Sequence, residues 1–206
     1  MSAKVLITGF EPFGGDKENP SEQIVRRLGG RGIAGKQVMG LVLPVIFGES
    51  WERLRVVLDA EEPEVVICLG LASNRNCLSL ERVAINVDDA RIPDNRNQQP
   101  VDEAIEPDGP AAYWTRIPIK AVRERLLASG VAAEISQTAG TYVCNHVFYS
   151  LMHWLDTRKH LRGGFVHVPK IGELFDLDRL VAAVELIVET TLSVHEDERA
   201  SGGSIS

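Results

Sequence analysis

The chain has 206 residues, of which 44% are hydrophobic and 25% charged, and its formal net charge is -7. These proportions are typical of a globular protein, and the length suits one domain with a sizeable core, so we treat residues 1–206 as a single domain. The charge balance argues against nucleic acid or an anionic membrane surface as partner, because both require clustered Lys and Arg. The N-terminal apolar run is too short for a signal peptide or a membrane span, which predicts a cytoplasmic protein.

Segments rich in β-branched and aliphatic residues alternate with segments of helical period, as in βαβ units around a mostly parallel sheet. We expect strands at 4–8, 36–43, 64–69, 78–88, 131–136 and 164–168, and helices at 19–28, 48–61, 118–130, 141–159 and 176–194. The polar, proline-rich stretch 90–110 is the longest irregular one, and irregular segments of that length in compact domains are usually functional. The polar tail 195–206 has no apolar face, so we expect it to be disordered.

The segment Ala139-Gly-Thr-Tyr-Val-Cys-Asn-His146 runs from a small-residue turn into the predicted helix at 141–159. If Thr141 caps this helix, Cys144 is its third residue, where the helix dipole and unpaired backbone N–H groups favour a thiolate. The same N–H groups are free to stabilise an oxyanion. The cysteine count is odd, and we interpret Cys68 and Cys77 as structural.

A cysteine nucleophile needs a base, and His167 is the best placed of the five histidines. It lies at the carboxyl end of a predicted strand with Phe165 on the same face, at the edge where α/β proteins bind ligands. A satisfied core histidine is the equally weighted alternative. His146, His153 and His160 recur every seven residues, about 10.5 Å apart along a helix, which is too far for one metal ion and points to surface or interface packing.

Four acidic residues are candidates for orienting the base, and Glu81 stands out because it interrupts an apolar strand; the others are Asp88, Asp89 and Asp94. A solvent-facing charge on an edge strand, paired with Arg75 or Arg82, explains Glu81 equally well. The loop Gly9–Gly15 lacks the spacing of a nucleotide-binding loop. Its Phe10 and Phe13 suit the wall of a small apolar pocket, although ordinary loop packing explains them as well.

Together these stretches resemble the pyrrolidone-carboxylate peptidases, also called pyroglutamyl peptidase type I, a family of cysteine peptidases. The similarity covers most of the chain. It rests on residues 9–15 with Asn19-Pro20-Ser21, on Glu81-Arg-Val-Ala-Ile-Asn86, Asp89-Ala-Arg-Ile-Pro-Asp-Asn95, Asp108-Gly-Pro-Ala-Ala-Tyr113, Thr138 to His146, and Gly163-Gly-Phe-Val-His-Val-Pro169.

The resemblance implies a three-layer α/β/α sandwich and hydrolysis of the amide bond after an N-terminal pyroglutamyl residue. It assigns Cys144 as nucleophile, His167 as base and Glu81 as orienting carboxylate, with Arg91 near the oxyanion. It places a substrate ring among Phe10, Phe13, Leu71, Tyr142 and Val143. It further implies no metal or organic cofactor and a homotetramer whose substrates are peptides beginning with pyroglutamate.

The chain departs from the family pattern at two places. Leu71 stands where the family usually has a glutamine that bonds the lactam, so affinity or ring selectivity is expected to differ. The segment Lys170-Ile-Gly-Glu-Leu174 replaces the family's usual continuation after Pro169. Two other functions remain open: a catalytically silent binder of blocked N-termini, motivated by Leu71, and an enzyme similar to nucleoside phosphorylases, motivated by the layering and the first loop.

Overall fold

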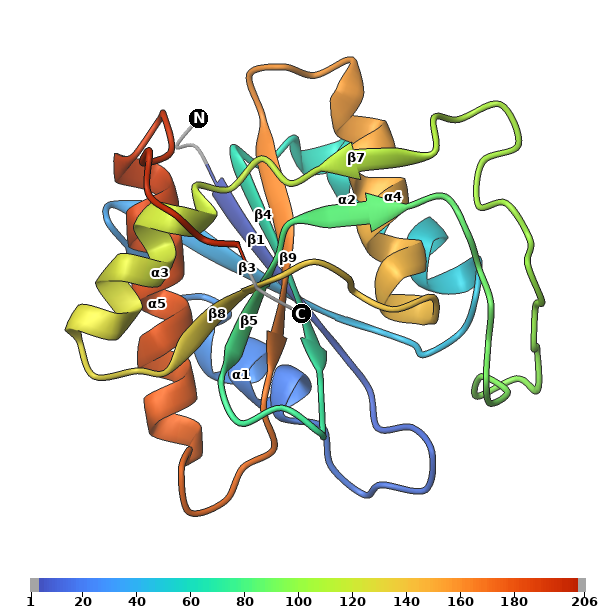
Figure 1. Ribbon diagram of the computed structural model, residues 1–206, viewed down its shortest axis with the longest axis horizontal. Coiled ribbons are helices and arrows are strands. Elements are labelled where there is room, and N and C mark those ends of the chain that lie inside the picture. Colours follow the sequence, from blue (N-terminus) through green and yellow to red (C-terminus); the bar gives the residue numbers. More distant parts are fainter. Residues whose placement is uncertain (1–3, 204–206) are drawn as a thin grey trace.

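The computed structural model describes residues 4–203 and contains a seven-stranded sheet with helices on both faces (Figure 1). The strand order is β2-β3-β1-β4-β9-β5-β8. Strands β3, β1, β4 and β9 are parallel to one another, whereas β2 and the parallel pair β5 and β8 run antiparallel to their neighbours β3 and β9. The predicted α/β class with a mostly parallel sheet is therefore confirmed.

Every predicted helix is present, and each predicted strand matches at least one observed strand. The strands are β1 (Lys4–Phe10), β2 (Gly32–Ile33), β3 (Lys36–Leu43), β4 (Val65–Leu71), β5 (Leu78–Glu81), β6 (Val83–Ile85), β7 (Ala112–Trp114), β8 (Ala133–Ser136) and β9 (Arg162–Val168). The helices are α1 (Pro20–Leu28), α2 (Glu49–Glu61), α3 (Ile119–Ala128), α4 (Val143–Asp156) and α5 (Leu177–Ser193).

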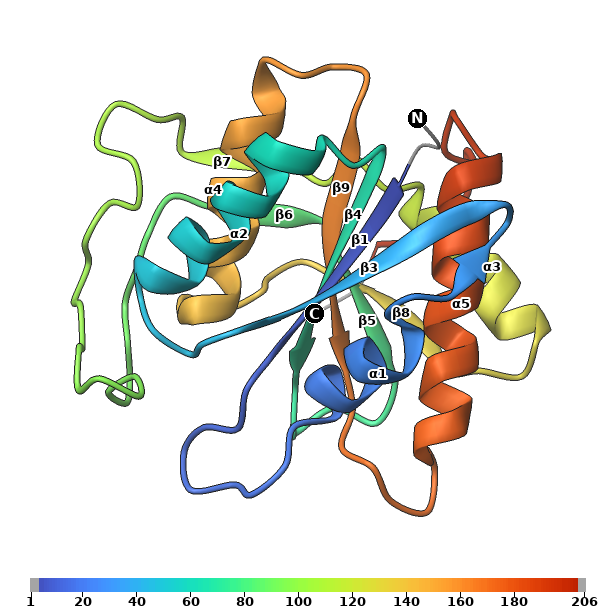
Figure 2. The ribbon, with the colours of Figure 1, turned by 180° about the vertical axis from the view of Figure 1, so that it is seen from behind.

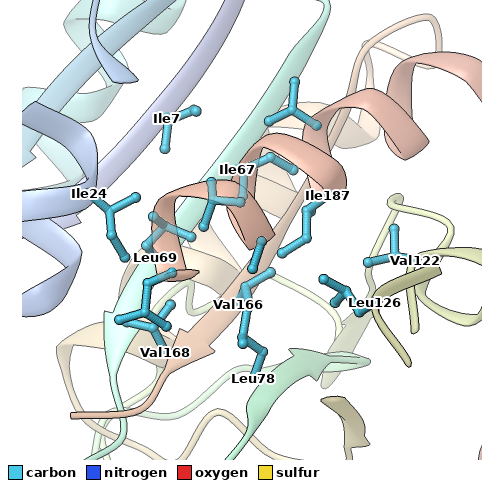
Figure 3. Packing of buried hydrophobic residues seen from close by; sticks show 14 of the residues in the cluster. Ile7, Ile24, Ile67, Leu69, Leu78, Val122, Leu126, Val166, Val168 and Ile187 are labelled. Carbon is cyan, nitrogen blue, oxygen red and sulfur yellow. The ribbon is translucent and has the colours of Figure 1, made fainter. Parts of the chain in front are cut away.

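Two hydrophobic layers enclose the sheet. On one face α1, α3 and α5 cover a core that includes Ile24, Val166 and Ile187 (Figure 3). On the other face, where Figure 2 shows α2 and α4, the core includes Phe10, Phe165 and neighbouring apolar residues. Because side chains alternate along a strand, Phe165 and Val166 enter opposite layers.

The segment 78–88 is not one strand, as the sequence predicted, but two. Strand β5 stays in the main sheet, and after Arg82 the chain leaves it to pair, as β6, with β7 in a separate two-stranded sheet beside α4 (Figure 1). Backbone hydrogen bonds from Arg82 N–H to Ser136 C=O and from Thr115 N–H to Arg82 C=O hold this exit. The long irregular stretch that we predicted at 90–110 follows β6.

Residues 195–203 contain no helix or strand, yet they contact the body of the protein. The Asp197 carboxylate accepts hydrogen bonds from the Lys120 and Ala121 N–H groups at the start of α3, which lacks a side-chain cap of its own. The Arg82 guanidinium donates to Gly202 C=O at 2.8 Å. This part of the predicted disordered tail therefore caps a helix. No helix among the described residues is long and apolar enough to cross a bilayer.

Candidate active site

Helix α4 begins one residue later than the sequence predicted. Tyr142 is its N-cap, and the Thr141 hydroxyl instead donates to Asp89 C=O at 2.7 Å. Cys144 is therefore the second helical residue rather than the third. Since Tyr142 supplies no side-chain cap, the N–H groups of Val143 and Cys144 donate to no acceptor within residues 4–203. The start of the helix thus presents unpaired donors beside the thiol, as an oxyanion site requires.

Glu81 and His167 form a buried hydrogen-bonded pair. His167 Nδ1 lies 2.7 Å from Glu81 Oε1; Glu81 is fully buried and His167 is 5% exposed. The same Oε1 atom accepts from Arg75 Nη1 at 2.7 Å, and Arg75 Nη2 donates to Thr138 C=O at 3.2 Å. Since β5 lies between β9 and β8, Glu81 is not a water-facing charge on an edge strand. We considered an ion pair with Arg75 only for a solvent-facing Glu81, but the buried carboxylate binds both Arg75 and His167.

Cys144 lies beside the strand that pairs with the strand of His167. Gly70 in β4 pairs with His167 in β9, and a Cβ atom added to Gly70 would lie 2.8 Å from Cys144 Sγ. The sulfur therefore lies beside Gly70, the strand neighbour of His167, in the space that a side chain at position 70 would need. Sequence reasoning missed Gly70, although an isolated glycine inside a buried strand often marks such a close approach.

Burial has the largest effect on the pKa of the Cys144 thiol. Removal from water raises the pKa of its thiol to about 12, and the negative charge of Glu81 adds to this, while Arg75 opposes it. The thiolate that we expected from the helix dipole is therefore not the resting state at neutral pH.

A small apolar pocket lies against the thiol. It is lined by the five residues that the resemblance named for the substrate ring, together with Cys144, Asn19 and Val45; these five are Phe10, Phe13, Leu71, Tyr142 and Val143. Its free space is about 10 Å³, enough for roughly one water molecule, so a ring enters only if lining side chains move. Phe13 belongs to the irregular loop between β1 and α1 and is only partly buried.

His146 forms a second histidine–carboxylate pair, which corrects our expectation of surface or interface packing. It is 8% exposed; its Nδ1 lies 2.8 Å from Asp88 Oδ2, and its Nε2 accepts from Gly48 N–H at 3.2 Å. Phe47 packs edge-on against both His146 and Tyr142, with ring centroids 5.7 and 5.4 Å apart. The pair thus supports one wall of the pocket.

Arg91, Asp89, His153 and His160 lie on the surface, whereas Asp94 is buried and accepts from the Phe47 N–H group at 3.0 Å. The Arg91 side chain is exposed and forms no hydrogen bond or ion pair with the residues that the structure describes, so its proximity to an oxyanion stays a prediction. His153 and His160 are exposed, as the spacing argument expected. Within residues 4–203, no three His, Cys, Asp or Glu side chains are grouped closely enough to hold a metal ion.

Comparison with known proteins agrees with this arrangement. The profile of the family described as pyroglutamyl peptidase matches residues 3–194. The chain belongs to this family. It is 48% identical to pyrrolidone-carboxylate peptidase 1 of Ralstonia nicotianae, covering 98% of both chains, and 45% identical to the pyrrolidone-carboxylate peptidase of Bacillus cytotoxicus, covering 97% of this chain and 98% of that one.

Solved structures of family members have the same fold. Pyroglutamyl peptidase I from Bacillus amyloliquefaciens superposes with a TM-score of 0.93 at 41% identity, covering 98% of this chain and 100% of that one. The pyrrolidone carboxyl peptidase from Thermococcus litoralis gives 0.88 at 41% identity, covering 92% of this chain and 93% of that one. Family membership therefore extends over nearly the whole fold that positions Cys144, His167 and Glu81.

Proposed function

We propose that this protein is a cysteine peptidase that removes an N-terminal pyroglutamyl residue from peptides. Family membership over nearly the whole chain supports this reaction. The contact that carries the proposal for the residues is the one between Cys144 Sγ and the Gly70 backbone, beside a histidine bonded to a buried carboxylate. A nucleophile, a base and an orienting acid are the three groups that acyl transfer requires.

The first half of the reaction forms a thioester. His167 takes the Cys144 proton on Nε2 as the sulfur attacks the pyroglutamyl carbonyl carbon, since Nδ1 is held by Glu81. The N–H groups of Val143 and Cys144 stabilise the resulting oxyanion. The carbon–nitrogen bond then breaks, and the imidazolium gives its proton to the leaving amine.

The second half releases the product. Water attacks the thioester carbon while His167 takes one of its protons, and the sulfur leaves with that proton as the thiol is restored. Because the raised pKa keeps Cys144 neutral, proton transfer to His167 accompanies attack rather than preceding it. The apolar pocket favours a compact, uncharged lactam ring over the charged amine of an ordinary N-terminus.

Replacing Cys144 tests the assignment. Cys144→Ala is expected to abolish cleavage of a pyroglutamyl chromogenic substrate, whereas the matched variant Cys77→Ala, a cysteine outside the pocket, should retain it. Retained turnover in Cys144→Ala would refute the role of the thiol. Tight binding of pyroglutamyl peptides by the unmodified protein with no turnover would instead favour a silent binder.

We further propose from the resemblance that the chain assembles as a homotetramer and works in the cytoplasm without a cofactor. Light scattering coupled to gel filtration tests the assembly, because a tetramer has four times the mass of the chain. Full activity after dialysis against a chelator tests the absence of a metal requirement. Fractionation of the native cells tests the location.

A further inference from the structure

A second, larger hollow lies directly beside the apolar pocket. It has about 350 Å³ of free space, and its apolar lining consists of Pro20, Leu71 and Ile171. Leu71 lines the apolar pocket as well, so the two spaces meet at this side chain. The hollow lies between the loop that joins β1 to α1 and the segment that follows β9; both segments are at the lower edge of Figure 2.

We propose that this hollow, named here the leaving-group subsite, binds the side chain of the residue that follows the pyroglutamyl group and favours an uncharged, apolar one. The inference rests on the proposed function. In that reaction the leaving amine must lie at His167, which protonates it. The chain continues from His167 through Pro169 to Lys170 and Ile171, which line the hollow. A peptide whose ring contacts Leu71 therefore has this space next to its second residue.

The charges around the hollow explain the preference for an uncharged side chain. Two acids, Asp16 and Glu18, alternate with two bases, Lys17 and Lys170, so the rim has no net charge. Lys170 Nζ lies 3.6 Å from Asp16 Oδ2, and both side chains are about half exposed, so the pair is weak and screened. With no surplus charge at the rim, selectivity comes from contact with the apolar lining.

A neighbouring hollow is the rival location for the leaving group. It is lined by Arg75, Asn76 and Leu174 among others, shares Lys170 and Ile171 with the first hollow, and has about 290 Å³ of free space. It shares no residue with the apolar pocket, and its Arg75 holds the Glu81 carboxylate. Continuity through Leu71 therefore favours the first hollow.

The test compares kcat/KM for the amides pyroglutamyl-Leu-NH2, pyroglutamyl-Ala-NH2 and pyroglutamyl-Asp-NH2. We expect the unmodified enzyme to prefer Leu over Ala by about three- to tenfold and to cleave the Asp amide no faster than the Ala amide. Gln23→Trp, which fills the leaving-group subsite from α1, should lower the Leu-to-Ala ratio to one or below, because the space for the larger side chain is lost. Ile171→Ala, on an exposed segment where folding is not at stake, should lower the ratio as well; because Ile171 also lines the rival hollow, Gln23→Trp decides between the two hollows.

The matched control is Asn76→Trp, which fills the rival hollow and should leave the ratio unchanged. A ratio that responds to Asn76→Trp but not to Gln23→Trp would overturn the proposal, as would a ratio near one in the unmodified enzyme. Both outcomes differ from failure of the proposed function, in which the unmodified protein cleaves none of the three amides and the subsite is refuted with it.

Discussion

Gly70→Ala tests whether the sulfur's position decides catalysis. The new Cβ atom would lie 2.8 Å from Cys144 Sγ and 2.9 Å from two ring carbons of Phe165. Favourable contacts between such atoms begin near 3.5 Å, so both contacts are too short, by roughly 0.6–0.7 Å, and must be relieved. Phe165 is fully buried against Phe10 and Phe148, with ring centroids 6.5 and 5.8 Å away, so we expect the partly exposed cysteine to move.

The expected result is a loss of turnover larger than the loss of stability would explain. A displacement approaching 1 Å at a reacting atom costs about 10²-fold in rate. Overpacking of the core costs about 1–3 kcal/mol in the free energy of unfolding. We would measure kcat with a pyroglutamyl chromogenic substrate at saturation and the free energy of unfolding in urea.

Gly164→Ala is the matched control, because it overpacks the other face of the same sheet. Its Cβ would lie 2.4 Å from Thr115 Oγ1 and 2.9 Å from Ile117 Cγ1, away from the active site. It should destabilise the protein at least as much while kcat stays within about twofold. Equal loss of kcat in both variants, or unchanged kcat in Gly70→Ala, would refute the argument from the sulfur's position.

Three further predictions concern the thiol and the residues around it. Arg75→Met should lower kcat about 10- to 100-fold because the carboxylate of the histidine pair loses the group that fixes it, whereas Arg82→Met, which lacks that contact, should not. Asp88→Ala and His146→Ala should each destabilise the protein, and urea unfolding of the double variant should reveal a coupling of about 1–3 kcal/mol; additive costs would mean that the pair contributes nothing as a pair. Because burial raises the Cys144 pKa to about 12, its alkylation by iodoacetamide, followed by peptide mass spectrometry, should accelerate about tenfold per pH unit from pH 7 to pH 9; a plateau near pH 7 would indicate a preformed thiolate.

The sequence predicts most of the fold because the periodicity of a long segment is enough to identify it as a helix or a strand. Helices α2 and α5 were located to within two residues at each end, and the buried strand β4 follows from its continuous apolar run. The two-residue strand β2 and the three-residue β7 are too short to have a period. The sequence also does not reveal the break after Glu81, because residues 78–88 keep an extended pattern throughout. The backbone partners of Arg82 at the break, Ser136 and Thr115, are far away in the chain.

The candidate site was likewise predicted from the sequence only in part. Residue type and local position identified Cys144, His167 and Glu81 as candidates, since a thiol, an imidazole and a lone acid in an apolar strand are unusual where they stand. The sequence could not show which of these side chains contact one another. The contact between His146 and Asp88 spans 58 positions and depends on how α4 lies against the long loop, so periodicity along α4 alone pointed to the wrong environment.

The burial of Cys144 gives the start of α4 a different role from the one that its sequence first indicated. A helix N-terminus beside a thiol usually favours the thiolate, but here loss of water and the nearby Glu81 charge raise the pKa of the thiol to about 12. The unpaired N–H groups of Val143 and Cys144 therefore have no resting charge to stabilise. In the proposed reaction, negative charge appears beside them only when the oxyanion forms, so their stabilisation would be specific to the transition state and would accelerate the chemical step rather than substrate binding.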